Sequence, residues 1–145
     1  MVFASENDFA QYIHQLGGHA WLVGGAVRDQ LLNIECTDKD YFITGLSPDE
    51  LPIERIAGSQ FPVFLIKIDK QICEVALART ERKISIGHKG FEFNTSKHLT
   101  ASEDLARRDL TINSMAINLI SNELIDPFNG QADLNAKLIR HTTDA

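Results

Sequence analysis

Apolar positions recur in this chain with two spacings, which together predict alternating helices and strands. From Phe9 to Leu16 they recur every three or four residues, as in a helix, and Gly17 and Gly18 end it. Further helices are predicted at residues 26–32 and 131–137, with short ones opened by Ser47 and Thr100. β-Rich apolar runs predict strands at residues 20–23, 39–44, 61–68, 72–78, 117–120 and 123–125. The pattern therefore predicts an α+β fold: a small mixed sheet, mostly antiparallel, with helices mainly on one face.

Residues 79–99 depart from both spacings. They contain three lysines and two glycines but little apolar periodicity. We expect an exposed, mobile loop here, between the antiparallel hairpin of strands 61–68 and 72–78 and the helix that begins at Thr100.

The composition is that of one globular domain. The 145 residues are 43% hydrophobic and 23% charged, which allows a sizeable core, and no apolar run approaches the roughly 20 residues that cross a bilayer. Cys36 and Cys73 belong to no CxxC or Cys/His cluster, so we expect reduced thiols in a cytoplasmic protein without a secretory signal. The formal net charge of −6 argues against a wide nucleic-acid surface. Any such contact is then local, metal-assisted, or helped by residues outside this chain.

Gly24 and Gly25 stand between a predicted strand and a predicted helix. Two glycines permit a sharp turn and a close approach by a ligand, and the N–H groups that begin a helix favour phosphate. Arg28, one turn later, can reach the same anion. The spacing is not that of a dinucleotide-binding fingerprint, and tight packing alone also explains two glycines at this point.

Three carboxylates are candidates for metal chemistry. Asp38 and Asp40 are two residues apart at the start of a predicted strand, so their side chains share one face and repel each other unless a cation lies between them. Oxygen ligands of this kind suit magnesium, although such pairs are also common as solvated turn residues. Glu74 supplies a third carboxylate if its strand neighbours that of Asp40. The alternative is an edge-strand glutamate that faces water.

A second charged group lies at residues 104–113. Arg108 can pair with a phosphate. Asp109 and Asn113 are four residues apart, which on a helix places them on one face, where they can hold a ribose hydroxyl. Taken alone, this segment is better explained as a solvated, charged helix end.

Several of these segments, in this order, resemble one family. Residues 22–29 read LVGGAVRD and residues 38–40 read DKD, which resembles the signature of class II tRNA nucleotidyltransferases (CCA-adding enzymes) and bacterial poly(A) polymerases. Residues 107–116, RRDLTINSMA, resemble their arginine–arginine–aspartate motif, and residues 126–130, DPFNG, resemble a further one. Residues 76–83, ALARTERK, are similar to the gammaproteobacterial multifunctional type.

The resemblance implies a polymerase-β-type nucleotidyltransferase head that adds CMP and AMP, from CTP and ATP, to the 3′-hydroxyl of tRNA. It implies magnesium on Asp38 and Asp40, and a loop at residues 82–99 that helps the enzyme switch from CTP to ATP. The remaining implied contacts are with the triphosphate, by Gly24, Gly25 and Arg28, and with the incoming nucleotide, by Arg108, Asp109 and Asn113.

The family's other parts have no counterpart in the sequence. Nothing matches the neck motif that selects the base, or the body, tail and phosphohydrolase domains, so we expect residues 1–145 to be a single head domain. Three interpretations remain open. The chain is the head of a CCA-adding enzyme, the head of a poly(A) polymerase or another nucleotidyltransferase with a different acceptor, or a non-catalytic nucleotide-binding or protein-interaction module that kept this fold.

Overall fold

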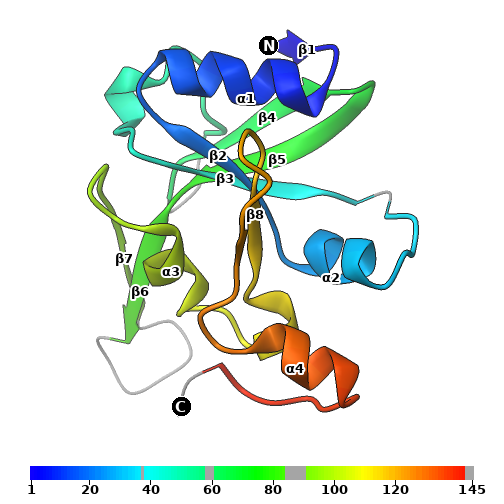
Figure 1. Ribbon diagram of the computed structural model, residues 1–145. Helices are drawn as coiled ribbons and strands as arrows, with labels where there is room; N and C mark the ends of the chain where they lie inside the picture. Colours follow the sequence, from blue (N-terminus) through cyan, green and yellow to red (C-terminus); the bar gives the residue numbers. More distant parts are fainter. Residues whose placement is uncertain (37, 58–60, 84–90, 143–145) are drawn as a thin grey trace.

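The computed structural model describes residues 1–36, 38–57, 61–83 and 91–142. Figure 1 shows a twisted sheet with helices on both sides. Its strands are β1 (Val2–Phe3), β2 (His19–Val23), β3 (Asp40–Thr44), β4 (Val63–Ile68), β5 (Gln71–Leu77), β8 (Ala116–Asn118) and β9 (Leu124–Ile125). The helices are α1 (Glu6–Gln15), α2 (Gly25–Leu31), α3 (Ala101–Leu105) and α4 (Gly130–Asn135), with 3-10 turns η1 (Pro48–Glu50) and η2 (Thr111–Asn113).

The seven strands are ordered β1-β4-β5-β3-β2-β8-β9. β1 pairs with β4 and β3 with β5 in parallel, whereas the other four pairings are antiparallel. The α+β class and the mixed, mostly antiparallel sheet predicted from the sequence are therefore confirmed. β1 was not predicted, because two residues are too few to show an alternation. Within the described ranges, no helix is both long and apolar enough to span a bilayer.

The two faces of the sheet have separate coverings. α1 and α2 cover one face, where Phe9, Ile13 and Val27 are buried together with Leu22 and Ile43. The short α3 packs against part of the other face, in a smaller cluster that contains the β2 and β3 residues with the opposite orientation. The predicted arrangement, with helices mainly on one face, thus holds for α1 and α2. The β5–β4 part of the other face, together with the Asp40 end of β3, is left open.

The predicted turns and caps are borne out at most positions. Gly17 follows α1, as predicted, with a φ of 98°, while the cap of α1 by Ser5 was not predicted. Thr100 and Glu103 form the expected capping box at the start of α3. The β4–β5 hairpin closes at Asp69 and Lys70, which both have positive φ, as a tight two-residue turn requires.

The prediction of a loop over residues 79–99 was wrong for much of that segment. Arg79–Lys83 forms β6 and Phe91–Thr95 forms β7, and the two pair as an antiparallel ribbon separate from the main sheet. Residues 84–90, within the predicted switching loop, lie outside the described residues. The ribbon was missed because β6 is charged, so its extended conformation depends on pairing with β7 and on contacts to α3 rather than on apolar alternation.

Candidate active site

The two glycines make a corner where β2 leaves the sheet and α2 begins. Gly24 has φ 75° and ψ −142°, a conformation that is essentially restricted to glycine. A Cβ atom on Gly24 would lie 4.0 Å from Nη1 of Arg108, and one on Gly25 would lie 3.2 Å from Nη2 of Arg28. The corner therefore lies between two arginines that are 80 residues apart in the sequence.

Both candidate aspartates lie beside this corner. Asp38 and Asp40 are exposed, and both line a cavity of about 370 Å³ together with Gly25 and Arg28. Asp40 is the first residue of β3, whereas Asp38 precedes that strand. The structure thus brings the predicted carboxylate pair and the predicted phosphate corner into one cavity.

Arg28 is held by two oxygen acceptors. Its Nε donates to Oδ1 of Asp29 at 3.1 Å, and its Nη1 donates to Oδ1 of Asn113, also at 3.1 Å. Asn113 belongs to η2, so this hydrogen bond joins the glycine corner to the arginine–arginine–aspartate segment. Asn113 is in this way placed at the site, although by contact with Arg28 rather than by the helical spacing used to predict it.

Glu74 neighbours the aspartate strand, as its candidate role requires. Tyr41 on β3 pairs with Val75 on β5 in parallel, so the preceding residues, Asp40 and Glu74, share the open face of the sheet. Both line a second cavity of about 220 Å³. Glu74 is exposed, so the structure leaves its carboxylate accessible from that cavity.

The same cavity is lined by three arginines, Arg79, Arg107 and Arg108. Burial lowers the pKa of Arg108, while the charges of Asp104 and Asp40 oppose that shift, so the guanidinium stays charged beside the carboxylates. Of these three, Arg108 was predicted from the sequence as a site residue, whereas Arg79 and Arg107 were not. The only signal for Arg79 was its place in the segment at residues 76–83.

Asp109 does not take the position that helical spacing predicts. α3 ends at Leu105, and Asp109 lies in the turn before η2, so Asp109 and Asn113 are not on one helix face. Asp109 is exposed, and its backbone oxygen accepts a hydrogen bond from the N–H of Thr142. It lines neither of the two cavities described above. The chain turns here because the N–H of Thr111 donates to the carbonyl of Arg140 and Leu110 forms a bridge with His141.

The donor set suits a metal ion that keeps ligands from elsewhere. Among the described residues no group of three or more His, Cys, Asp or Glu side chains is arranged to hold a metal ion. Asp38 and Asp40 together provide two exposed carboxylates and no nitrogen or sulfur ligand. This fits a hard cation such as magnesium, which retains waters and takes oxygens from a bound phosphate.

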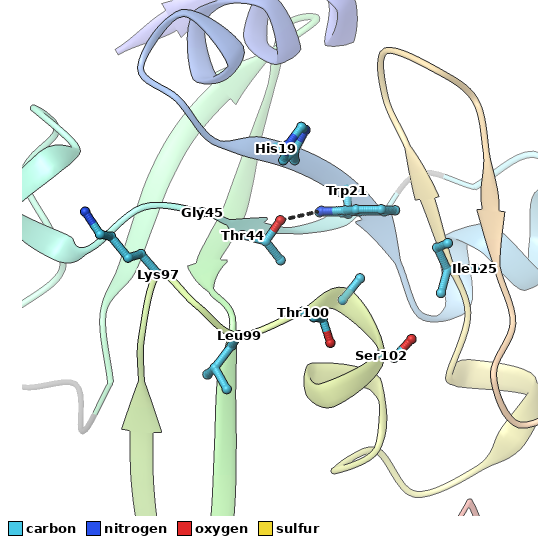
Figure 2. Close-up of a pocket in the computed structure, with 10 residues that line it drawn as sticks. His19, Trp21, Thr44, Gly45, Lys97, Leu99, Thr100, Ser102 and Ile125 are labelled. Atoms are coloured by element: carbon cyan, nitrogen blue, oxygen red, sulfur yellow. Dashed lines mark hydrogen bonds between the residues drawn. The ribbon is translucent and has the colours of Figure 1, made fainter.

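A third cavity lies away from these groups (Figure 2). It has a volume of about 390 Å³ and is lined by Trp21, Leu99 and Ile125 among others. Trp21 Nε1 donates to Thr44 Oγ1 at 2.9 Å, as Figure 2 shows. None of the candidate site residues lines this cavity, and no carboxylate does either. The candidate residues therefore gather at the glycine corner and not at this third cavity.

Residues 20–140 match the model of the poly A polymerase head domain. The chain belongs to this head-domain family. The resemblance to CCA-adding enzymes and poly(A) polymerases is thereby confirmed. The head domain is 52% identical over 128 residues to a CCA-adding enzyme of Francisella tularensis subsp. tularensis, and 46% identical over 132 residues to a multifunctional CCA protein of Burkholderia cenocepacia. Each match covers 86% of this chain but only 34% and 32% of the relative, so the chain spans about a third of their length.

Solved structures show the same head. The CCA-adding enzyme of Bacillus stearothermophilus in complex with CTP matches with a TM-score of 0.70 and 30% identity, over 92% of this chain and 31% of that one. A tRNA nucleotidyltransferase complexed with a primer tRNA and an incoming ATP analog matches with a TM-score of 0.69 and 32% identity, over 92% of this chain and 38% of that one. The predicted polymerase-type head fold is confirmed.

Proposed function

We propose that the chain is a single catalytic head domain that transfers CMP or AMP from CTP or ATP to the 3′-hydroxyl of tRNA. The observation that carries the proposal is the shared cavity of Asp38, Asp40, Arg28 and Gly25. The relatives named above support the reaction and its substrates, since they include CCA-adding enzymes and structures with CTP or with primer tRNA. The cytoplasmic location stays a prediction from the cysteine content.

In this proposal the glycine corner and two arginines hold the triphosphate. Gly24 and Gly25 have no Cβ, so the backbone can approach phosphate oxygens, while Arg28 and Arg108 flank the corner. The buried Nε atoms of Arg107 and Arg108 have no hydrogen-bond partner among the described residues. An anionic ligand satisfies such donors, which supports nucleotide binding beside the second cavity, the one that Arg107 and Arg108 line.

Asp38 and Asp40 would hold Mg²⁺, which supplies activation of the attacking hydroxyl and stabilises charge on the attacking and leaving oxygens. The 3′-oxygen forms the new bond to the α-phosphorus as the bond to pyrophosphate breaks, and the hydroxyl proton passes to solvent. Glu74 adds negative charge beside Asp40, and we assign it as a third carboxylate of the site. Arg28, held by Asp29 and Asn113, is oriented before the nucleotide arrives.

Nucleotide addition tests the proposal directly. The 145-residue protein is incubated with Mg²⁺, each nucleoside triphosphate separately, and a tRNA that ends just before its CCA. We expect addition of C that Asp38→Ala abolishes and Asp49→Ala, an exposed aspartate outside the cavities, leaves unchanged. Addition of A alone would instead favour a poly(A) polymerase head. Addition unaffected by Asp38→Ala would contradict the assigned site.

Thiol modification measures binding without turnover. Cys36 lines the same cavity as Asp38, whereas Cys73 is buried and burial raises the pKa of its thiol. We expect Mg²⁺ with CTP to slow modification of Cys36 in the wild type but not in Asp38→Ala. Binding without any addition would mean that acceptor contacts lie outside this chain. Loss of both binding and addition would support a non-catalytic module.

A further inference from the structure

Asp104 is a fully buried carboxylate near the second cavity, the one that contains Asp40 and Glu74. Asp104 itself does not line that cavity. Its Oδ2 accepts a hydrogen bond from the backbone N–H of Arg79 at 2.9 Å, which ties α3 to the first residue of β6. Its Oδ1 lies 3.3 Å from Nη2 of Arg107 and 3.2 Å from Nη2 of Arg108. The buried carboxylate of Asp104 therefore binds three groups: one backbone N–H on β6 and two arginine side chains in the turn that follows α3.

Both arginines held in this way line the cavity that contains Asp40 and Glu74. An arginine side chain is long, and its guanidinium group forms strong paired contacts with any accessible carboxylate. Asp40 and Glu74 are exposed and share one face of the sheet. Nη1 of Arg107 also lies 3.5 Å from Oε1 of Glu81, a second acceptor outside the cavity. Arg108 is therefore the arginine for which Asp40 and Glu74 would be the alternative acceptors within the cavity.

We propose that Asp104 is a positioning residue whose carboxylate holds the guanidinium group of Arg108 away from Asp40 and Glu74. This leaves Asp40 available to the divalent cation that it would share with Asp38, with the negative charge of Glu74 beside it. The inference rests on the proposed function in one respect, namely that a cation binds there. The arrangement also explains why Arg108 shares a small cavity with Asp40 and Glu74 while its ion pair is with Asp104.

Asp104→Asn is the informative variant because it keeps the shape and an acceptor for the Arg79 N–H but removes the charge. We expect the dissociation constant for Mn²⁺ alone to rise about fivefold, which corresponds to the free energy of one exposed ion pair. The electron paramagnetic resonance signal of the free ion measures this constant. Asp104→Asn combined with Arg108→Met should restore it. The control Asp133→Asn, at a buried aspartate paired with Arg140 outside the cavity, should leave it unchanged.

A stability cycle tests the same idea without any metal or nucleotide. Asp40→Asn should change the unfolding equilibrium constant little in the wild type. In the Asp104→Asn background it should raise that constant about fivefold, because the new pair between Arg108 and Asp40 is lost. Equal effects in the two backgrounds would overturn the positioning role. If the wild type binds no Mn²⁺, the proposed function fails, while this cycle still decides the role of Asp104.

A variant with Asp104 intact covers the case in which Asp104→Asn does not fold. Arg108→Met alone should change Mn²⁺ affinity less than about twofold, since Arg108 is already held by Asp104. A gain of about fivefold or more would mean that Arg108 already occupies the carboxylates, and would overturn the proposal.

Discussion

Neighbouring residues of β3 lie on opposite faces of the sheet and in different surroundings. Tyr41 and Ile43 are buried beneath α1, where the ring of Phe9 lies 5.7 Å from that of Tyr41. On the other face, Asp40 is exposed in a cavity that it shares with Glu74. The start of β3 thus carries core packing on one side and candidate chemistry on the other, while Phe42, further along the Asp40 face, is buried with residues of α3.

At the start of β3, core packing and candidate chemistry are separated by the alternation of the strand rather than by distance. Successive side chains are only one residue apart, yet Tyr41 is buried against α1 and removes apolar area from water, whereas Asp40 on the opposite face is exposed. The open face also carries exposed Leu65 and Ile72, so it is not protected by helices at this end. Substitutions at adjacent positions should therefore have opposite consequences.

The largest expected difference in the free energy of unfolding is between alanine substitutions of Phe64 and of Leu65 on β4. Phe64 is 1% exposed and Leu65 is 52% exposed. Phe64→Ala should lower the free energy of unfolding by about 3–5 kcal/mol, because it leaves a cavity in the core. Leu65→Ala should lower it by less than about 0.5 kcal/mol. Urea denaturation measures both values, and equal losses would show that the open face is also part of the core.

The glycine corner should show the next largest difference. Gly24→Ala leaves room for the methyl group, but alanine disfavours the positive φ of this position. The substitution should therefore cost about 1–3 kcal/mol of folding free energy. Gly25→Ala begins a helix and meets only the movable end of Arg28, so it should cost little. Thermal denaturation of the two variants is the measurement, and similar melting temperatures would contradict a backbone cause.

Tyr41 links the core face to α1 through its hydroxyl group. That hydroxyl donates to Oε2 of Glu6 at 2.6 Å, so Tyr41→Phe should lower the free energy of unfolding by about 1.5 kcal/mol. Burial raises the pKa of Tyr41, and Glu6 raises it further. The wild type should therefore lose stability as the pH rises above about 10, where an unfolded tyrosine ionises, and Tyr41→Phe should lose less. Identical pH profiles would contradict this.

The α1 face of the sheet could be predicted from the sequence, because its buried positions are apolar and recur with the spacing of strands and helices. β2, β3, β4 and β5 are each marked by their own apolar residues. β6 is not, since its residues are charged and its start is fixed by the carboxylate of Asp104, 25 positions away. Such long-range contacts have no periodic signature.

The candidate site divides in the same way. Gly24, Gly25, Asp38 and Asp40 are close in sequence, and the structure brings them together as predicted. Asp109 was placed by helical spacing, which assumed that the helix continues beyond Leu105. The chain instead turns, because the N–H of Thr111 bonds to the carbonyl of Arg140 and Leu110 forms a bridge with His141. A local pattern could not anticipate a partner near the C-terminal end.

The smallest effect on stability, with a large effect on chemistry, is expected for the open-face carboxylates. Asp40→Asn and Glu74→Gln should each change the free energy of unfolding by less than about 0.5 kcal/mol, because both side chains are exposed. Nucleotide transfer by Asp40→Asn should fall by about 10²-fold or more if Asp40 holds the metal that stabilises the developing charge.

Urea denaturation and a transfer assay of the same samples separate the two effects, with Asp49→Asn as an exposed control outside the cavities. A loss of about 2 kcal/mol or more in Asp40→Asn would mean that this carboxylate stabilises the fold, as a buried, hydrogen-bonded one does. Unchanged stability with lost transfer would instead show that the open face of β3 is kept for chemistry, at no measurable gain in folding free energy.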